Sequence, residues 1–200
     1  MATARGEAPT RARDNPFRVE RVHALEYRFP AGGPAALLSR FEQLGRRAVI
    51  VGAEGSGKST LLARLAPAFE EAGRRVRPFA ARPDEDAAAR LRSLLREMEP
   101  RELLLLDGFD HLSRLARFGL LRRVAKIGAG LLATSHRTER ALPTLIDLAP
   151  NSELLEDLAR DLAGAEIDGL DVVEIHRRHR GNLRTALREL YDLWGERERF

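Results

Sequence analysis

Three glycines, three hydroxyl residues and one lysine fall within nine consecutive positions, residues 52–60. Their order, Gly-Ala-Glu-Gly-Ser-Gly-Lys-Ser-Thr, matches the pattern G-x-x-x-x-G-K-[ST] in full. Glycines let the backbone curl so that successive N–H groups point at phosphate oxygens. In this chemistry the Lys58 ammonium reaches the β- and γ-phosphates, and the Ser59 hydroxyl ligates Mg²⁺. The residues predicted to contact the nucleotide are Gly52, Glu54, Gly55, Ser56, Gly57, Lys58, Ser59 and Thr60.

The segments on either side of this loop suit the same chemistry. Residues 48–51 are apolar and predict a buried strand, and a helix is expected from Lys58 to about Ala72. Such a helix directs the positive end of its dipole at a bound phosphate. A glycine-rich turn that binds nothing is the alternative, and the strand–loop–helix context argues against it. No separate guanine-reading motif is visible, so we predict ATP with Mg²⁺.

A second acidic position follows the leucine run at 103–106, which predicts a central strand buried on both faces. The carboxylate that ends this run, Asp107, would lie beside the loop and hold Mg²⁺, as in a Walker B strand. Capping of the next helix is the alternative role. Many ATPases place a glutamate next, but Gly108 stands there. Asp110 and His111 are therefore the nearest candidates to activate water, although Asp110 could instead cap the following helix.

A further apolar strand, 130–134, ends in Thr134-Ser135-His136. These polar side chains, Ser135 among them, are candidates to contact the γ-phosphate or the attacking water, and a polar strand end facing solvent is the alternative. Arg137 and Arg140 could neutralise phosphate charge, but surface positions are the favoured interpretation in so arginine-rich a chain. Glu54 is a weaker candidate for the base, because loop side chains often face solvent.

The pattern of the whole chain predicts an α/β fold with a parallel sheet, because strands alternate with helices. Residues 1–14 lack periodicity and are expected to form a flexible tail. Residues 15–150 are expected to form the nucleotide-binding domain, and 151–200, which show helical patterns only, a small lid. Besides those named, strands are predicted at 76–80 and 144–148, a short one at 25–29, and helices at 35–44, 84–98, 112–126 and 183–194.

The composition is that of a globular protein, with 44% hydrophobic residues in a chain of 200. The net charge is +4 and the isoelectric point about 10.2, since arginine supplies nearly all the basic residues. Lys58 and Lys126 are the only lysines among 34 basic residues. A lysine retained in so arginine-rich a chain suggests a specific function, and phosphate binding provides one for Lys58. The absence of cysteine excludes disulfides and thiolate sites. No apolar stretch could cross a bilayer and no secretory signal is visible, so a cytoplasmic location is expected.

Taken together, the motifs resemble the additional-strand class of P-loop ATPases, and particularly AAA+-like proteins. The resemblance covers about 15–195 and is strongest at 48–60 and 103–110. It implies a three-layer fold with a five-stranded parallel sheet in the order 5-1-4-3-2, and a helical lid. Thr134-Ser135-His136 then matches the sensor 1 position. Gly181-Asn182-Leu183-Arg184 resembles a sensor 2 motif, in which Arg184 reaches the γ-phosphate.

This resemblance has departures and leaves alternatives open. The glutamate after Asp107 and the asparagine common at sensor 1 are both missing, which leaves hydrolysis and ring assembly unsupported. Asn15-Pro16-Phe17 is similar to the adenine-contacting start of origin-recognition-like and transposition-associated ATPases. The basic run 176–180 could contact nucleic acid, but a solvated helix end is favoured. The leading prediction is an ATPase that acts on a protein or nucleic-acid partner and could form a homo-oligomer. The rivals are a nucleotide-dependent switch that hardly hydrolyses ATP and a small-molecule kinase.

Overall fold

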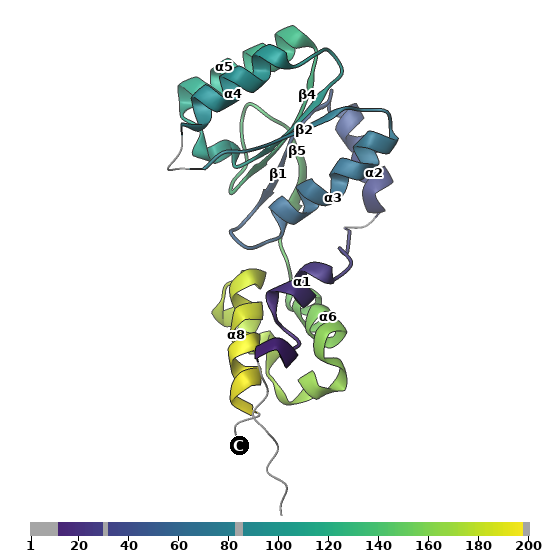
Figure 1. Cartoon of the computed structure of the whole chain (residues 1–200), viewed down its shortest axis with the longest axis vertical. Coiled ribbons are helices and arrows are strands. Elements are labelled where there is room, and N and C mark those ends of the chain that lie inside the picture. The colour runs from purple at the N-terminus through teal and green to yellow at the C-terminus, as the bar shows by residue number, and fades with distance from the viewer. Residues whose placement is uncertain (1–11, 30–31, 83–85, 198–200) are drawn as a thin grey trace, which may run out of the picture. The chain divides into compact units, whose positions relative to one another are not determined.

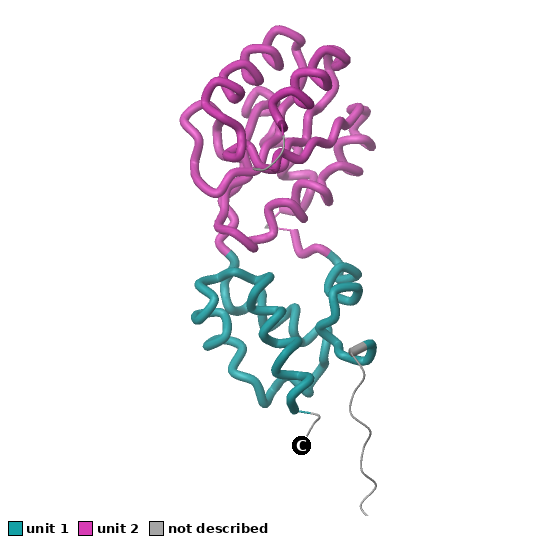
Figure 2. Tube along the Cα trace, turned by 60° about the vertical axis from the view of Figure 1, so that its left-hand side comes forward, with its two compact units in different colours: residues 1–26, 150–200 teal, residues 27–149 magenta. Residues whose placement is uncertain are grey.

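The computed structural model describes residues 12–29, 32–82 and 86–197, and the chain divides into two compact units (Figure 2). The sheet unit comprises Tyr27–Ala149. The helical unit comprises the described residues of 1–26 and 150–200. Each unit has its own hydrophobic core, and the clusters of buried residues that form these cores have no member in common.

The sheet unit is built on five parallel strands in the order β2-β3-β4-β1-β5 (Figure 1). This is the predicted order 5-1-4-3-2 read from the opposite edge, so the predicted sheet is confirmed. The strands are β1 (Arg47–Gly52), β2 (Val76–Ala80), β3 (Leu103–Asp107), β4 (Gly130–Ser135) and β5 (Thr144–Leu148).

The leucine run of β3 explains how the sheet becomes the middle layer of three. Leu104 and Leu106 belong to one core cluster, and Leu103 and Leu105 to another, because successive side chains of a strand point to opposite faces. The first cluster includes residues of α4 (Ala87–Glu97) and α5 (Arg114–Ile127). The second includes residues of α2 (Gly33–Gln43) and α3 (Lys58–Glu71).

The helical unit begins at the N-terminal end of the chain. Phe17 is 3% exposed, and its ring centroid lies 5.6 Å from that of Trp194 in an edge-on arrangement. Asn15 donates a hydrogen bond from Nδ2 to the Tyr191 carbonyl at 2.8 Å. The elements of this unit are η1 (Ala12–Asp14), α1 (Val19–Ala24), α6 (Ser152–Ala163), η3 (Gly164–Gly169), α7 (Val172–Arg178) and α8 (Leu183–Arg197).

These contacts correct the predicted domain boundary at residue 15. Residues up to Glu26 group with the C-terminal helices and not with the sheet unit, because Phe17, Val22 and Leu25 pack into the helical core. Residues 12–14 of the predicted tail form η1, and the remainder of that tail lies outside the described residues.

Two local predictions also differ from the structure. Residues 25–29 form no strand. Tyr27 and Phe29 instead contact each other edge to face, with ring centroids 5.0 Å apart, and pack against a core cluster of their own unit. The helix predicted at 84–98 begins at Ala87, after Asp86 caps it by accepting from the Ala89 N–H. Asp84 and Glu85 lie outside the described residues. Among the described helices, none has the length and apolar character to span a membrane.

Candidate nucleotide-binding site

The loop between β1 and α3 carries its glycines where a side chain would clash or where the backbone has a positive φ angle. A Cβ atom on Gly52 would lie 2.5 Å from the Ser56 Oγ and 2.7 Å from the Leu148 carbonyl oxygen. Gly55 and Gly57 have φ angles of 73° and 91°, a region that favours glycine. The helix α3 starts directly after Gly57, so its unpaired N–H groups and positive dipole end face the loop.

Lys58 is folded into this loop. The residue is 7% exposed, and its Nζ donates hydrogen bonds to the carbonyl oxygens of Gly52 at 2.7 Å and Ala53 at 2.6 Å. A buried ammonium group needs such acceptors, because leaving it unpaired would cost several kcal/mol, on the order of a lost charged hydrogen bond or more. The loop therefore holds the Lys58 ammonium group in place through its own carbonyl oxygens.

Asp107 lies where β3, β4 and α3 meet. The Ser59 hydroxyl donates to Asp107 Oδ1 at 3.0 Å, and the Thr134 hydroxyl donates to the same oxygen at 2.6 Å. The Gly108 N–H in turn donates to Thr134 Oγ1 at 2.8 Å. Parallel register explains this convergence, since Leu106 pairs with Ala133 and the next residue of each strand therefore lies alongside.

The residues at this point fit a magnesium ion and a phosphate. Ser59 and Asp107 together offer a hydroxyl and a carboxylate, the hard oxygen ligands that Mg²⁺ takes. The Ser56 Oγ is buried, and no described residue provides it with a hydrogen-bond partner. A buried hydroxyl without a partner in the loop before α3 suits a phosphate oxygen as acceptor.

Asp110 forms a pair with His136 beside the same strand ends. Asp110 lies in the short helix η2 (Phe109–His111), and its Oδ2 is 2.5 Å from His136 Nδ1 and 3.3 Å from the His136 backbone N–H. Burial acts to raise the pKa of the Asp110 carboxyl, but the hydrogen bonds and charge of His136 outweigh it, so the pKa is lowered. Asp110 is therefore an ionised carboxylate at neutral pH.

The alternative role of Asp110 as a helix cap is wrong. The helix α5 begins at Arg114, two residues later than predicted, and its cap is Ser113, whose hydroxyl accepts from the Ala116 N–H at 3.2 Å. The Asp110 carboxylate instead has one oxygen, Oδ1, that is buried without a hydrogen-bond partner in the described part of the chain. The Asp110 carboxylate therefore does not cap α5.

Arg117, Glu139 and Ser135 form a set of contacts beside this pair that the sequence did not predict. Arg117 donates to the Asp110 carbonyl at 2.8 Å and forms a salt bridge with Glu139 at 3.3 Å. Glu139 also accepts from the Ser135 hydroxyl at 3.1 Å. Ser135 is only 1% exposed, so the hydroxyl predicted to contact nucleotide is directed to Glu139. No pattern in the sequence signals this contact, because residues 135–139 form no helix in which a spacing of four would bring side chains together.

The other predicted positions are exposed. Glu54 and Thr60 face solvent in and beside the loop, and so do Arg137 and Arg140 after β4. Arg184 is exposed in the first turn of α8, within the helical unit. The turn before it has a structural function, since Gly181 has a φ angle of 79° and Asn182 caps α8 by accepting from the Thr185 N–H at 3.2 Å.

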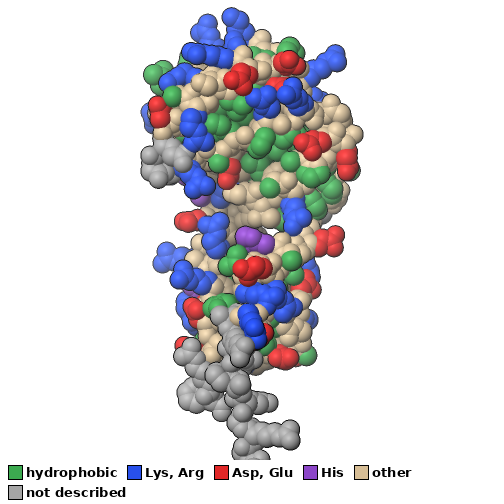
Figure 3. Space-filling view, in the orientation of Figure 1, with side chains coloured by type: hydrophobic (Ala, Val, Ile, Leu, Met, Phe, Trp, Pro, Cys, Tyr) green, Lys and Arg blue, Asp and Glu red, His purple; other side chains and the backbone are tan. Residues whose placement is uncertain are grey.

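The basic run at 176–180 is largely neutralised by its neighbours. Arg177 forms a two-point salt bridge with Glu174, and Glu189 pairs with both Arg178 and His179. Figure 3 shows blue and red side chains interspersed over the visible face of this unit. The compensated charges favour the solvated helix end over a phosphate-contacting patch.

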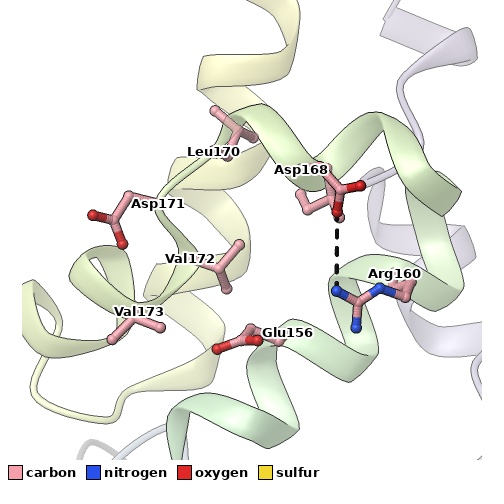
Figure 4. A pocket seen from close by; sticks show the side chains of 8 residues that line it. Glu156, Arg160, Asp168, Leu170, Asp171, Val172 and Val173 are labelled. Atoms are coloured by element: carbon pink, nitrogen blue, oxygen red, sulfur yellow. Dashed lines mark ion pairs between the residues drawn. The ribbon is translucent and has the colours of Figure 1, made fainter.

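The helical unit also contains a shallow pocket lined by residues between Glu156 and Val173 (Figure 4). Its charged lining comprises three carboxylates and one guanidinium, that of Arg160, which lies 4.0 Å from Asp168 Oδ1. Such a lining repels phosphate groups. This pocket therefore does not compete with the loop at Gly52 as a nucleotide site.

Comparison with known proteins agrees with this fold. No protein-family model matches the chain, and no curated protein matches it. Among solved structures, the chain is similar to RuvB of Thermotoga maritima, a Holliday junction branch migration motor, with 17% identity and a TM-score of 0.54 over 86% of this chain. The K64R mutant of that RuvB gives 17% identity and a TM-score of 0.52 over 78% of this chain. The chain spans 60% and 57% of the length of these two structures.

The fold and site together define the class. The chain has the three-layer P-loop NTPase fold of the additional-strand class, with the P-loop strand between β4 and β5. Within that class the fold is AAA+-like, as its similarity to RuvB shows.

Proposed function

We propose that the chain is a Mg²⁺-dependent ATPase of the AAA+-like type. The observation that carries this proposal is the meeting of Ser59 and Asp107, whose oxygens lie 3.0 Å apart at the start of the helix that follows the phosphate loop. A bound Mg²⁺ ion would supply positive charge for the β- and γ-phosphates. The loop, the lysine and the two magnesium ligands supply the positioning and electrostatics on which phosphoryl transfer depends.

Each residue has a separate task in this proposal. Lys58 exchanges its two carbonyl acceptors for phosphate oxygens, so its charge is never left unpaired. Thr134 holds the Asp107 carboxylate in place through its hydroxyl. Asp110, ionised and oriented by His136, accepts a proton from or orients the attacking water in place of the missing glutamate.

A nucleotide-dependent switch with little hydrolysis is the second candidate. Gly108 occupies the position of that glutamate, and its φ angle of 88° in a buried turn leaves no side chain there. A Cβ atom on Gly108 would also lie 2.8 Å from the Ala81 carbonyl oxygen. A glutamate could not replace this residue without rearrangement, so water activation must come from elsewhere or be weak.

We also propose that nucleotide state moves the helical unit as a lid and governs a protein partner. The helix α5 leaves Leu115 80% and Phe118 63% exposed one turn apart. Its sequence, RLARFGLLRRVAKI, contains no acidic residue. A protein surface with apolar and acidic groups complements this face better than nucleic acid does, because large aliphatic side chains gain from apolar contact.

The test compares binding and hydrolysis in three variants. Lys58→Ala should weaken Mg-ATP affinity by about 10- to 100-fold, because it removes charged hydrogen bonds. Asp107→Asn should keep most of the binding and lose phosphate release. Lys126→Ala, which alters the only other lysine, should behave as wild type in both assays. The measurements are calorimetric titration with Mg-ATP and a phosphate-release assay.

The outcomes separate the candidates. Wild type that binds Mg-ATP but releases no phosphate supports the switch. Wild-type turnover by Asp107→Asn would refute the magnesium assignment, and unaltered binding by Lys58→Ala would refute the nucleotide site itself.

A further inference from the structure

Asp110, His111 and His136 form a cluster that offers nitrogen as well as oxygen ligands. Each provides one ligand atom, and the three atoms lie within 4.8 Å of one another. Asp110 and His111 follow β3 in η2, and His136 follows β4. Because β3 and β4 are adjacent and parallel, their carboxyl ends bring these side chains to the same edge of the sheet.

The surroundings of His111 prepare it for metal binding. Its Nδ1 lies 2.9 Å from the carbonyl oxygen of Ala81, just beyond β2. A carbonyl oxygen can only accept, so Nδ1 carries the proton and the lone pair of the neutral ring is left on Nε2. Metal-binding histidines are oriented in this way, with one ring nitrogen donating to a backbone carbonyl and the other facing the ion.

Asp110 and His136 supply the other two ligands. They lie 2.5 Å apart through Oδ2 and Nδ1, and the second oxygen, Oδ1, has no hydrogen-bond partner among the described residues. Two ligand atoms of a tetrahedral zinc ion are about 3.4 Å apart, given bonds of about 2.1 Å. Asp110 Oδ2 and His136 Nδ1 are closer than this, and one ligand atom from each of the three residues lies within 4.8 Å of the others. Small rotations of the two exposed histidine side chains would close the site.

We propose that Asp110, His111 and His136 bind a transition-metal cation such as Zn²⁺. Two imidazoles and one carboxylate suit Zn²⁺, Ni²⁺ or Co²⁺, whereas Mg²⁺ prefers the all-oxygen ligands at Ser59 and Asp107. Three protein ligands leave at least one position for water, so this is an open site and not a closed structural one. The cation would bind the carboxylate of Asp110, the residue to which we assign water orientation. Hydrolysis should therefore be slower when the site is filled.

The binding site is tested without nucleotide, so this test does not depend on the proposed function. Untagged wild-type protein is titrated with Co²⁺, whose visible absorption reports nitrogen and oxygen coordination, and Zn²⁺ is then added as competitor. We expect saturation at one equivalent and displacement by Zn²⁺. His111→Gln and His136→Gln should each weaken Co²⁺ affinity by at least about tenfold. His23→Gln, at an exposed position in α1, is the matched control and should bind as wild type.

The results that overturn the site are specific. They are a wild type without Co²⁺-dependent absorption, a His111→Gln variant with wild-type affinity, or an equal loss in His23→Gln. Both cluster histidines are exposed, so a loss of binding with an unchanged circular dichroism spectrum is due to the ligand and not to unfolding.

The regulatory consequence rests on the proposed function and has its own readout. Zn²⁺ should reduce wild-type phosphate release at saturating Mg-ATP, and the ratio of rates with and without Zn²⁺ should move toward one in His111→Gln. If Co²⁺ binds as expected and Zn²⁺ leaves phosphate release unchanged, the site stands and its regulatory role is refuted. If the protein has no ATPase activity, the Co²⁺ titration still decides the site.

Discussion

At the scale of single residues, Asp107 and Asp110 show how neighbouring carboxylates acquire different functions. Asp107 accepts two hydroxyl hydrogen bonds, from Ser59 and Thr134, and so presents hard oxygens to a cation. Asp110 interacts with an imidazole, that of His136. The first arrangement suits magnesium, and the second holds an ionised carboxylate that can orient water or bind a softer cation.

The pair of Asp110 and His136 predicts a pH dependence. His136→Gln removes the imidazole hydrogen bond and charge that lower the pKa of Asp110, while the backbone N–H bonds remain, so that pKa should rise in the variant. A lowered carboxyl pKa stabilises the fold above the unfolded value of about 3.9 and ceases to do so as the pH falls through the folded value. Wild type should therefore be more stable than the variant at pH 7, and the difference should shrink at pH 3.

Carbon-detected NMR titration of Asp110, with denaturant unfolding at both pH values, measures these effects. His179→Gln is a suitable control, because His179 forms a similar 2.5 Å pair with Glu189 in the helical unit. An Asp110 pKa that is the same in wild type and His136→Gln would contradict the assignment.

At the scale of elements, the strand–loop–helix segment of β1 and α3 depends on how closely the loop approaches its neighbours. The glycine pattern predicts a curled loop. Only the fold shows that Gly52 lies against the Leu148 backbone of β5, a strand almost 100 residues further along the chain. The short helix η2 lies between β3 and α5. As a result α5 begins only at Arg114, and Asp110 lies outside α5.

Gly52→Ala tests this close approach. The added methyl group would overlap Ser56 and Leu148, so we expect a loss of about 1–3 kcal/mol in the free energy of unfolding, together with weaker Mg-ATP binding. Gly119→Ala is the matched control, because a Cβ atom there meets nothing within 4 Å and Gly119 lies inside α5. That variant should gain up to about 1 kcal/mol from helix propensity. Equal stability changes in the two variants, measured by urea unfolding, would contradict the packing argument.

At the scale of the whole molecule, the chain consists of two units with separate cores, and the helical unit is assembled from both ends of the sequence. Phe17 and Trp194 are 177 positions apart and yet pack in the same core. The predicted boundary near 150 agrees with the structure, whereas the assignment of residues 15–26 to the nucleotide-binding domain does not. Arg184, which the resemblance implies reaches the γ-phosphate, belongs to the helical unit, and we propose that it couples the lid to the nucleotide.

Arg184→Ala tests that dependence. If Arg184 contacts the γ-phosphate, its loss should weaken ATP affinity by about tenfold, as expected for a charged hydrogen bond, and leave ADP affinity unchanged. Arg188→Ala, one turn along α8 and also exposed, is the control and should leave both affinities unchanged. Competition titrations with the two nucleotides measure the ratio. Equal losses for ATP and ADP would show that Arg184 does not report the γ-phosphate.

The sequence by itself predicted the glycine-rich loop between β1 and α3, the carboxylate at the end of β3 and, through the resemblance, the sheet order. The loop and the carboxylate depend on local patterns, since glycine spacing and apolar runs act over a few residues. Only the tertiary structure decided that Thr134 contacts Asp107, that Ser135 is directed to Glu139, that Asp110 pairs with His136, and that Phe17 belongs to the helical core. The contacts of Thr134, His136 and Phe17 join distant segments and are set by strand register and core packing, which no local pattern encodes. The contact of Ser135 with Glu139 is short in sequence but depends on how the chain turns after β4.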